Sequence, residues 1–414
     1  MKLLFINAYF FPEVIAFSHL ERDLIEGLIF DDHKISVLCP VPTKGIDEKT
    51  AKTYKNIKQE YMFDGCVDVS RFAAPNEGRN PIVRALRYLW CNVRQYHLAK
   101  RYNDIDSVFC VSTPPTQGML CALVAKKLSK RYKKKVPFVF SLQDVFPDSL
   151  VTTGLTKKGS IIWKIGRKIE NYTYSHADKI IVISESMKKN IMEKGVPEEK
   201  IVVVSNWIDT EATKPISKEE NRIFEELGLA RDKFTVVYAG NFGKAQGADV
   251  VLETAERLKG HTDIQFVIFG GGAEFESAKE KAKGLPNVII NGLLPQERVP
   301  EVYSLGDVAI ITCKKGVGTS GMPSKTWSIM ACNTPIIAAF DTDSELADVI
   351  GKANAGVAVD PENADKLAEA ILEMKNGKAS NFSGGREYAV EYASKEKCTK
   401  KYVETIKNVC CICQ

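Results

Sequence analysis

Short apolar runs alternate with segments of helical periodicity throughout the first half of the chain. Runs of this kind, separated by amphipathic helices, are typical of parallel strands joined by right-handed crossovers. The first helix is predicted over His19–Phe30. The predicted strands are Leu3–Asn7, Ile35–Cys39, Ser107–Val111, Phe138–Leu142, Ile180–Ile183 and Ile201–Val204.

The same pattern starts again in the second half. A helix is predicted over Asp249–Leu258, and Asn206–Asp232, which is polar and acidic, predicts a linker. We therefore expect an α/β protein of two Rossmann-like, doubly wound domains: residues 1–205, residues 206–394 with the linker, and a final helix over 395–414 packing back on the first domain. Ligands of open parallel sheets bind at the carboxyl ends of strands, so the domains are expected to face a central cleft. The strands predicted here are Thr235–Ala239, Gln265–Phe269, Val288–Asn291, Val308–Thr312 and Pro335–Ala339.

Composition agrees with two globular domains and restricts the classes of ligand and the cellular location that we expect. A chain of 414 residues with 44% hydrophobic and 26% charged residues is long enough for two globular domains. The net charge of +5 suits an anionic substrate and does not indicate nucleic acid. The cysteines are scattered through apolar runs, as reduced thiols of a cytoplasmic protein are, and the group at Cys410, Cys411 and Cys413 lacks a nearby histidine. We expect no metal, no cofactor, no signal peptide and no membrane span.

A glycine-rich segment between a predicted strand and a helix carries the most chemical information. Glycines let the backbone approach a ligand closely, and Pro323 suits the first helical turn. The helix N-terminus offers N–H groups and a positive dipole to phosphate, whereas a plain helix cap with surface lysines is the alternative. The residues that suit phosphate in this loop are Gly316, Gly318, Ser320, Gly321, Ser324 and Lys325.

This loop resembles the donor-binding loop of family 4 retaining glycosyltransferases with the GT-B fold, in the branch that carries Pro-Ser-Lys there and includes bacterial O-antigen and capsule N-acetylfucosamine-type transferases. Further segments are similar to motifs of that branch in the same order. They are Tyr9–Glu13, Ser112–Pro115, Gln143–Asp148, Ser205–Asp209 and Gly240–Gly247.

The resemblance implies retaining transfer of a sugar, expected to be an N-acetylated amino or deoxyamino sugar, from a UDP-sugar to a lipid-linked or saccharide acceptor of bacterial surface polysaccharide synthesis. The sequence departs from the wider family at Ser320 and Ser328, where that family has glutamates, and at Asn241 and Gln246, where it has Arg and Lys. The donor-binding residues expected from the match are Asn241, Lys244, Gln246, Asn291, Gly318, Ser320, Gly321, Pro323, Ser324, Lys325 and Ser328.

Three residues are the candidates for catalysis. Lys325 would stabilise the charge that builds on the leaving phosphate. Asp144 follows a predicted strand and could assist removal of the acceptor proton, although a helix-capping Asp is the alternative. Glu345 could contact the donor sugar or serve only as an acid in the first turn of a helix. The resemblance also implies that the leaving phosphate itself acts as the base.

On the acceptor side, Glu13 lies in the first loop that matches the family, and His19 could reach the cleft or be simply packed or solvated. Trp90 with the stripe Ile82, Leu86, Leu89 and Val93, flanked by Arg84, Arg87 and Arg94, suits an anionic membrane surface, as does the basic run Lys126–Lys135. A stripe that faces the core is the alternative. The protein would then be peripheral on the inner face of the plasma membrane.

Two other functions fit the same sequence. One is a nucleotide-sugar epimerase of similar architecture. The other is a catalytically weak nucleotide-sugar-binding subunit, which the serines at Ser320 and Ser328 would favour.

Overall fold

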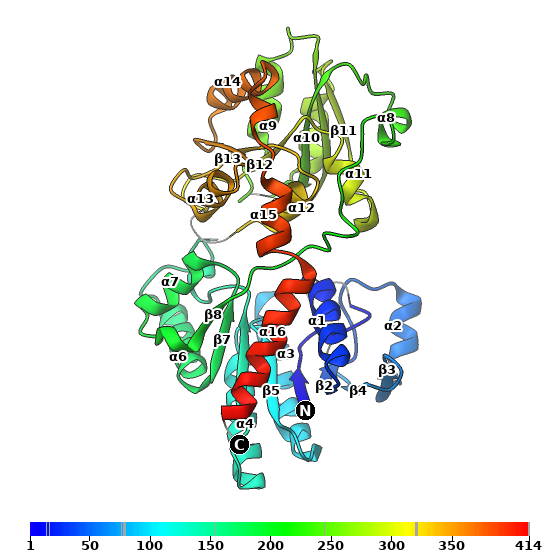
Figure 1. Ribbon diagram of the computed structural model, residues 1–414. Coiled ribbons are helices and arrows are strands. Elements are labelled where there is room, and N and C mark those ends of the chain that lie inside the picture. Colours follow the sequence, from blue (N-terminus) through cyan, green and yellow to red (C-terminus); the bar gives the residue numbers. More distant parts are fainter. Residues whose placement is uncertain are drawn as a thin grey trace. The chain divides into compact units, whose positions relative to one another are not determined.

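The computed structural model describes residues 1–13, 15, 17–75, 77, 80–152, 154–243, 245–318 and 322–412. The chain divides into two compact units, coloured along the sequence in Figure 1. The amino-terminal unit comprises Met1–Val204 and the chain from Thr399 on, and the carboxyl-terminal unit comprises Ser205–Cys398. Each unit is built on one twisted sheet with helices on both faces.

The sheet of the amino-terminal unit runs in the order β3-β4-β2-β1-β5-β6-β7-β8. Its strands pair in parallel, except that β3 and β4 form an antiparallel hairpin at one edge. The strands are β1 (Lys2–Ile6), β2 (Lys34–Pro40), β3 (Gln59–Met62), β4 (Val67–Phe72), β5 (Ser107–Val111), β6 (Phe138–Leu142), β7 (Lys179–Val182) and β8 (Ile201–Val203).

Helices cover both faces of this sheet. On one face, α4 packs between α3 and α6, and apolar side chains of all three join strand residues in one core. On the other face, α1 lies against α16: Gly27 of α1 approaches Thr399 and Val403 of α16. The helices are α1 (Ser18–Phe30), α2 (Glu48–Tyr54), α3 (Pro81–Leu98), α4 (Gln117–Tyr132), α5 (Asp148–Thr152), α6 (Ile161–His176), α7 (Glu185–Glu193) and α16 (Lys395–Ile412).

The carboxyl-terminal unit has a parallel sheet in the order β11-β10-β9-β12-β13-β14, so the strand order reverses between β9 and β12. Two apolar cores lie on its opposite faces. The strands are β9 (Phe234–Asn241), β10 (Ile264–Gly271), β11 (Val288–Gly292), β12 (Val308–Thr312), β13 (Ile336–Ala339) and β14 (Gly356–Val359). The helices are α8 (Ile223–Glu226), α9 (Asp249–Arg257), α10 (Phe275–Ala282), α11 (Val299–Tyr303), α12 (Lys325–Ala331), α13 (Glu345–Lys352), α14 (Ala364–Lys375) and α15 (Gly385–Tyr392).

Local sequence explains where several helices begin. Ser160, Ser184, Ser344 and Asn363 each accept a hydrogen bond from a backbone N–H in the first turn of the helix that follows. Side-chain oxygens at this position satisfy N–H groups that have no partner within the helix.

The structure confirms the predicted fold class, and it corrects some details. The segment 206–232, expected as a linker, packs into the carboxyl-terminal unit, because Ile223 and Phe224 are buried in its core. The β3–β4 hairpin and β14 were not predicted. Pro323 precedes α12 and is not in its first turn, since that helix begins at Lys325. Within the described residues, no helix combines the length and the apolar character needed to cross a membrane.

A buried hydrogen bond fixes α16 on the amino-terminal sheet. The hydroxyl of Tyr402 lies 2.9 Å from Oγ of Ser141 on β6, and the Tyr402 side chain is fully buried. Lys407 and Asp31 add an ion pair of 2.8 Å at the surface. The last helix is therefore part of the hydrophobic packing of this unit.

We predict that Tyr402→Phe lowers the free energy of unfolding by about 1 kcal/mol, the usual value of one buried hydrogen bond. Tyr402→Ala should cost about 3–5 kcal/mol because it also leaves a cavity. Urea unfolding followed by circular dichroism measures both. Tyr392→Phe, at an exposed position, is the matched control and should change nothing. An unfolding midpoint of Tyr402→Ala equal to that of the parent protein would contradict this role for α16.

Candidate active site

The carboxyl ends of β9 and β12 come together at the point where the strand order of the carboxyl-terminal sheet reverses. This point is where open α/β sheets bind their ligands. Gly240 and Asn241 end β9, and the predicted phosphate loop follows β12 and leads into α12. Lys325 is the first residue of α12, so the structure brings it to the end of β9, about 85 positions away in the sequence.

The side chain of Lys325 does not extend into solvent. Its Nζ is buried, lies 4.5 Å from the centre of the Tyr238 ring, and has no hydrogen-bond partner among the described residues. Burial lowers the pKa of this amine from 10.5 to about 8. A cation held away from water without a counter-charge is costly, and such groups are typical of ligand sites.

Gly240 provides the space that this amine occupies. A Cβ atom built on Gly240 would lie 2.6 Å from Nζ of Lys325 and 3.4 Å from the hydroxyl of Tyr238. Any side chain at position 240 would therefore displace the lysine. The glycine is needed here for a close approach, not for a special backbone angle.

Asp341, which follows β13, fixes the loop that precedes α12. Its carboxylate accepts hydrogen bonds from the backbone N–H of Gly316 at 2.9 Å and of Gly318 at 2.8 Å. The N–H of Lys315 donates to Glu362 at 3.1 Å. The N–H of Gly318, expected to bind phosphate, is thus already engaged by the protein. Sequence reasoning missed Asp341, because its contacts with Gly316 and Gly318 arise only from tertiary packing.

The turn after β9 packs against the same loop. The N–H of Lys314 donates to the carbonyl of Ala245 at 3.0 Å. Asn241 is exposed and lies over Gly272, where a Cβ would come within 1.9 Å of its Oδ1. Gln246 is partly buried beside Gly243. The structure therefore gathers Asn241, Gln246 and Lys325 around the ends of β9 and β12.

The other expected donor residues lie in β11, in or just before α12, or outside the described residues. Ser324 precedes α12 and is exposed, and Ser328 is one turn into that helix and partly buried. Asn291 is partly buried in β11, paired in register with Phe269 of β10. Glu345 begins α13 and is partly buried. Lys244, Ser320 and Gly321 lie outside the described residues.

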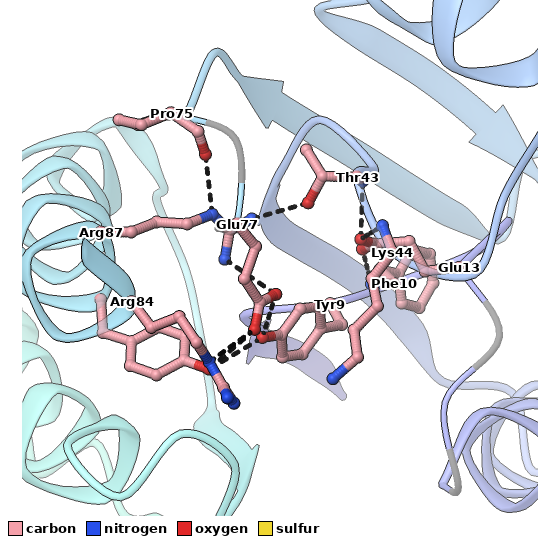
Figure 2. Close-up of polar contacts among 10 residues, drawn as sticks. Tyr9, Phe10, Glu13, Thr43, Lys44, Pro75, Glu77, Arg84 and Arg87 are labelled. Atoms are coloured by element: carbon pink, nitrogen blue, oxygen red, sulfur yellow. Dashed lines mark hydrogen bonds and ion pairs between the residues drawn. The ribbon is translucent and has the colours of Figure 1, made fainter. Parts of the chain in front are cut away.

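The amino-terminal unit has a polar cluster at the carboxyl ends of β1, β2 and β4, shown in Figure 2. The hydroxyl of Tyr9 donates to Glu77 at 2.7 Å and lies 3.0 Å from the hydroxyl of Tyr88 on α3. Nε of Arg84 lies 3.2 Å from the Glu77 carboxylate, and Nη1 of Arg87 lies 3.8 Å from it. Burial disfavours ionisation of Glu77, but the hydrogen bonds from Tyr9 and Tyr88 and the charges of Lys44 and Arg87 lower its pKa overall.

Glu13, expected to face the acceptor, is used by the fold. Its carboxylate is buried and accepts hydrogen bonds from the backbone N–H groups of Phe10, Thr43 and Lys44 at 3.1, 2.8 and 3.0 Å. Burial raises the pKa of Glu13 against the lowering effect of these hydrogen bonds. Glu13 therefore joins the loop after β1 to the loop after β2 (Figure 2).

The structure places the remaining amino-terminal candidates separately. Asp144 is exposed in the turn after β6, and this turn is tied to the end of β5 by a hydrogen bond of 3.0 Å from the Gln143 N–H to Oγ of Ser112. His19 is exposed in the first turn of α1. No group of three or more His, Cys, Asp and Glu side chains suited to a metal occurs in the described part of the chain. The expected independence from metal stays a prediction.

Two family models match the chain, one in each half. Residues 21–212 match the model described as Glycosyltransferase Family 4, and residues 219–396 match the model described as Glycosyl transferases group 1. The two matches together reach from α1 to the beginning of α16.

Curated relatives carry related names. A putative colanic acid biosynthesis glycosyl transferase, WcaI of Escherichia coli, is 25% identical over 98% of this chain and 100% of its own. A probable glycosyltransferase, WbjE of Pseudomonas aeruginosa, is 29% identical over 61% of this chain and 64% of its own.

Solved structures of low sequence identity share the fold. A sucrose-phosphate synthase from Thermosynechococcus elongatus superposes with a TM-score of 0.74 at 15% identity, covering 99% of both chains. Anabaena HepE, solved in complex with UDP, superposes with a TM-score of 0.69 at 15% identity, covering 99% of this chain and 100% of that one.

We predict that Lys325→Met stabilises the ligand-free protein at pH 7 while it lowers turnover. The shift in pKa corresponds to a cost of up to about 3 kcal/mol for the buried charge, which methionine removes without leaving a cavity. The advantage should shrink as the pH rises from about 8 to 10.5, because the folded protein then loses a proton that the unfolded chain keeps. Thermal unfolding at pH 7 and pH 10 measures this, and Lys283→Met, on the exposed surface, is the control. A loss of stability at pH 7 would mean that the amine has a partner.

Proposed function

Since its halves match Glycosyltransferase Family 4 and Glycosyl transferases group 1, the chain is a glycosyltransferase with the GT-B fold, and we propose a reaction for it. In this reaction a sugar moves from a UDP-sugar to a lipid-linked or saccharide acceptor. The proposed product belongs to a bacterial surface polysaccharide. The proposed reaction retains the anomeric configuration, and the proposed sugar is an N-acetylated amino or deoxyamino sugar.

The observation that carries this proposal is the buried amine of Lys325. It sits at the reversal of strand order, over a glycine that leaves room for it, and no hydrogen bond is available to it within the described residues. A diphosphate at this position would supply the missing counter-charge. Binding of the donor would thereby remove the free-energy cost of burying the charged amine in the ligand-free protein.

The same amine suits catalysis. Cleavage of a bond between a sugar and a diphosphate builds negative charge on the leaving phosphate, and a fixed cation stabilises that charge more in the transition state than in the ground state. Asn241 and Gln246 lie at the same strand ends and can donate further hydrogen bonds. We propose that this charge comes from the protein and that no divalent metal is required.

The choice of UDP and of polysaccharide synthesis is supported by the relatives. Anabaena HepE was solved with UDP and with UDP-glucose, and WcaI is named for colanic acid biosynthesis. The Pro-Ser-Lys at positions 323–325 supports the amino-sugar branch. For the acceptor proton we propose the leaving phosphate as base, with Asp144 as the assisting carboxylate.

Peripheral attachment to a membrane is the second part of the proposal, and one face of the amino-terminal unit supports it. The described side chains of the stripe on α3 are exposed and do not face the core: Leu86, Leu89, Trp90 and Val93 are 62, 61, 40 and 50% exposed. The side chain of Ile82 lies outside the described residues. On α6, Ile161, Ile162 and Ile165 are exposed as well. We refer to the outer surface of α3, α4 and α6 as the three-helix face.

The charges of the three-helix face have one sign. The sequences of α3 and α4 contain no Asp or Glu, and the acid of α6, Glu170, is buried and paired with Arg167 and Lys194. The sequence expectation needs a correction, however. Arg87 is buried in the Glu77 cluster, while Lys134 and Lys135 pair with Asp106 and Asp178. The cations left for lipid on these helices include Arg94, Lys126, Lys127, Lys130, Lys164 and Lys168.

Binding of UDP tests the proposed donor site. We expect calorimetric affinity for UDP in EDTA to be constant between about pH 7 and pH 8, where UDP is fully ionised, and to fall about tenfold for each pH unit above 8, because only the protonated amine pairs with the diphosphate. Lys325→Met should bind UDP more weakly at pH 7 and lose the pH dependence. Lys283→Met, at an exposed position just after α10, should behave as the parent. UDP binding by Lys325→Met that equals the parent's at every pH would refute the phosphate site.

Flotation with vesicles tests the membrane proposal. We expect the double variant Leu86→Ser, Leu89→Ser to lose at least tenfold in partition to vesicles containing phosphatidylglycerol, because each buried leucine contributes roughly 1.5–3 kcal/mol. The matched control is Phe30→Ser, Tyr392→Ser, whose exposed side chains lie on α1 and α15 and not on the three-helix face. Equal loss in both variants would show that the face is not the contact.

A further inference from the structure

A basic cavity lies beside the apolar stripe of α3 in the amino-terminal unit. Its volume is about 700 Å³. It opens between the end of α3 and the β3–β4 hairpin, and its wall includes Ser36 of β2 and Ser70 and Phe72 of β4. It belongs neither to the Glu77 cluster nor to the candidate donor site, so the proposed reaction leaves it unused.

Cations dominate the rim of this cavity. Lys55 and Lys58 line it from the segment between α2 and β3, and Arg94 and Arg101 line it from α3 and the turn after that helix. All four side chains are exposed, and within the described part of the chain none of them forms a salt bridge. The acid in the described lining, Asp68, accepts a hydrogen bond from Gln59 at 3.1 Å. The cavity therefore carries uncompensated positive charge.

Two residues that line the cavity, Phe72 and Arg94, lie against Trp90 of the stripe. The ring of Phe72, in the cavity wall, lies 6.0 Å from the ring of Trp90. Arg94 lies over Trp90, with 5.8 Å between its guanidinium carbon and the ring centre. Leu89, Trp90 and Val93 point outward on the same part of α3. A membrane that covers the stripe would thus bring its headgroups to the mouth of the cavity.

We propose that this cavity binds the headgroup of an anionic phospholipid when the three-helix face lies on a membrane. The phosphate would pair with Arg94 and Arg101 at the rim, while the acyl chains would lie along the apolar stripe. Guanidinium groups suit phosphate because they offer paired donors, and Ser36 and Ser70 can donate hydrogen bonds to a polar headgroup. The apolar stripe favours a lipid over free phosphate as the source of the anion.

The inference rests on the proposed membrane attachment and adds a specific site to it. Scattered surface lysines attract any anionic leaflet, and that attraction is shared over the whole face and screened by salt. A cavity, by contrast, holds one headgroup and saturates. The two contributions can therefore be separated with a lipid that is monomeric in solution.

The first experiment is a calorimetric titration of the full chain with dihexanoyl phosphatidylglycerol below its micelle concentration. We expect saturable binding that falls at least tenfold in the variant Lys58→Gln, Arg94→Gln, Arg101→Gln, which removes charges from the cavity rim. The variant Lys126→Gln, Lys127→Gln, Lys130→Gln removes as many charges from α4, outside the cavity, and should bind like the parent. Equal loss in the two variants, or no saturable binding by the parent, would overturn the inference.

Two further arms identify the ligand. Dihexanoyl phosphatidylcholine and inorganic phosphate should each bind at least tenfold more weakly than the anionic lipid, and phosphate that binds as tightly would make this a free-phosphate site. Ser70→Phe keeps every cation but fills the cavity, and it should lose lipid binding while its circular dichroism spectrum stays that of the parent, as proof that the amino-terminal unit is folded. Undiminished lipid binding by Ser70→Phe would place the headgroup outside the cavity.

Vesicle flotation separates this inference from the proposal on which it rests. If the parent does not float on phosphatidylglycerol vesicles, membrane attachment itself is refuted. If the parent floats but does not bind the monomeric lipid, attachment stands and the headgroup cavity is refuted. Flotation together with saturable binding that depends on Arg94 and Arg101 supports both.

Discussion

The constraint on which the site depends is a cation that the fold buries without a counter-charge. Nζ of Lys325 lies over the ring of Tyr238 and above Gly240, and no described side chain or carbonyl accepts a hydrogen bond from it. Burial lowers the pKa of the amine to about 8, so at neutral pH the ligand-free protein keeps a charge that its surroundings disfavour. An anion that enters this site removes that penalty, which makes the ligand-free state the strained one. In the proposed reaction, the buried amine would both bind the donor and stabilise the leaving phosphate.

Buried carboxylates fix the loops at the strand ends in both units. Asp341 accepts from the N–H groups of Gly316 and Gly318 in the loop before α12, and Glu13 accepts from Phe10, Thr43 and Lys44 in the loops after β1 and β2. A backbone held in this way by an adjacent element loses little entropy when a ligand binds. Each unit therefore keeps its loops in place with an acid whose carboxylate accepts hydrogen bonds from the backbone of those loops.

Much of the fold was predictable because parallel sheets follow from apolar runs between helices, and most of the predicted strands match observed ones within one or two residues. The β3–β4 hairpin was not predicted because Gln59–Met62 is half-exposed and polar, and so contains no apolar run that would indicate a strand. The loop before α12 was recognised from its glycines and its Pro-Ser-Lys. The anchoring by Asp341 and the isolation of the Lys325 amine could not be predicted, since both depend on residues brought together by tertiary packing. Glu13 was assigned to the acceptor side because a motif reveals that a loop matters and does not reveal which way its acid points.

The net charge of +5 conceals a separation of charge between the two faces of the amino-terminal sheet. On one face, α1 and α16 carry acids and bases together, as Asp31 and Lys407 illustrate. On the other face, the three-helix face carries exposed apolar residues among cations, and the acid of α6, Glu170, is buried and paired with Arg167 and Lys194. Exposed leucines and isoleucines on neighbouring helices contribute nothing to the core, and in water they favour aggregation. A sequence that keeps them beside unpaired cations has the composition of an interfacial surface, in which the apolar residues supply the free energy of insertion and the cations select an anionic leaflet. The basic cavity next to α3 is where these two properties meet in one site.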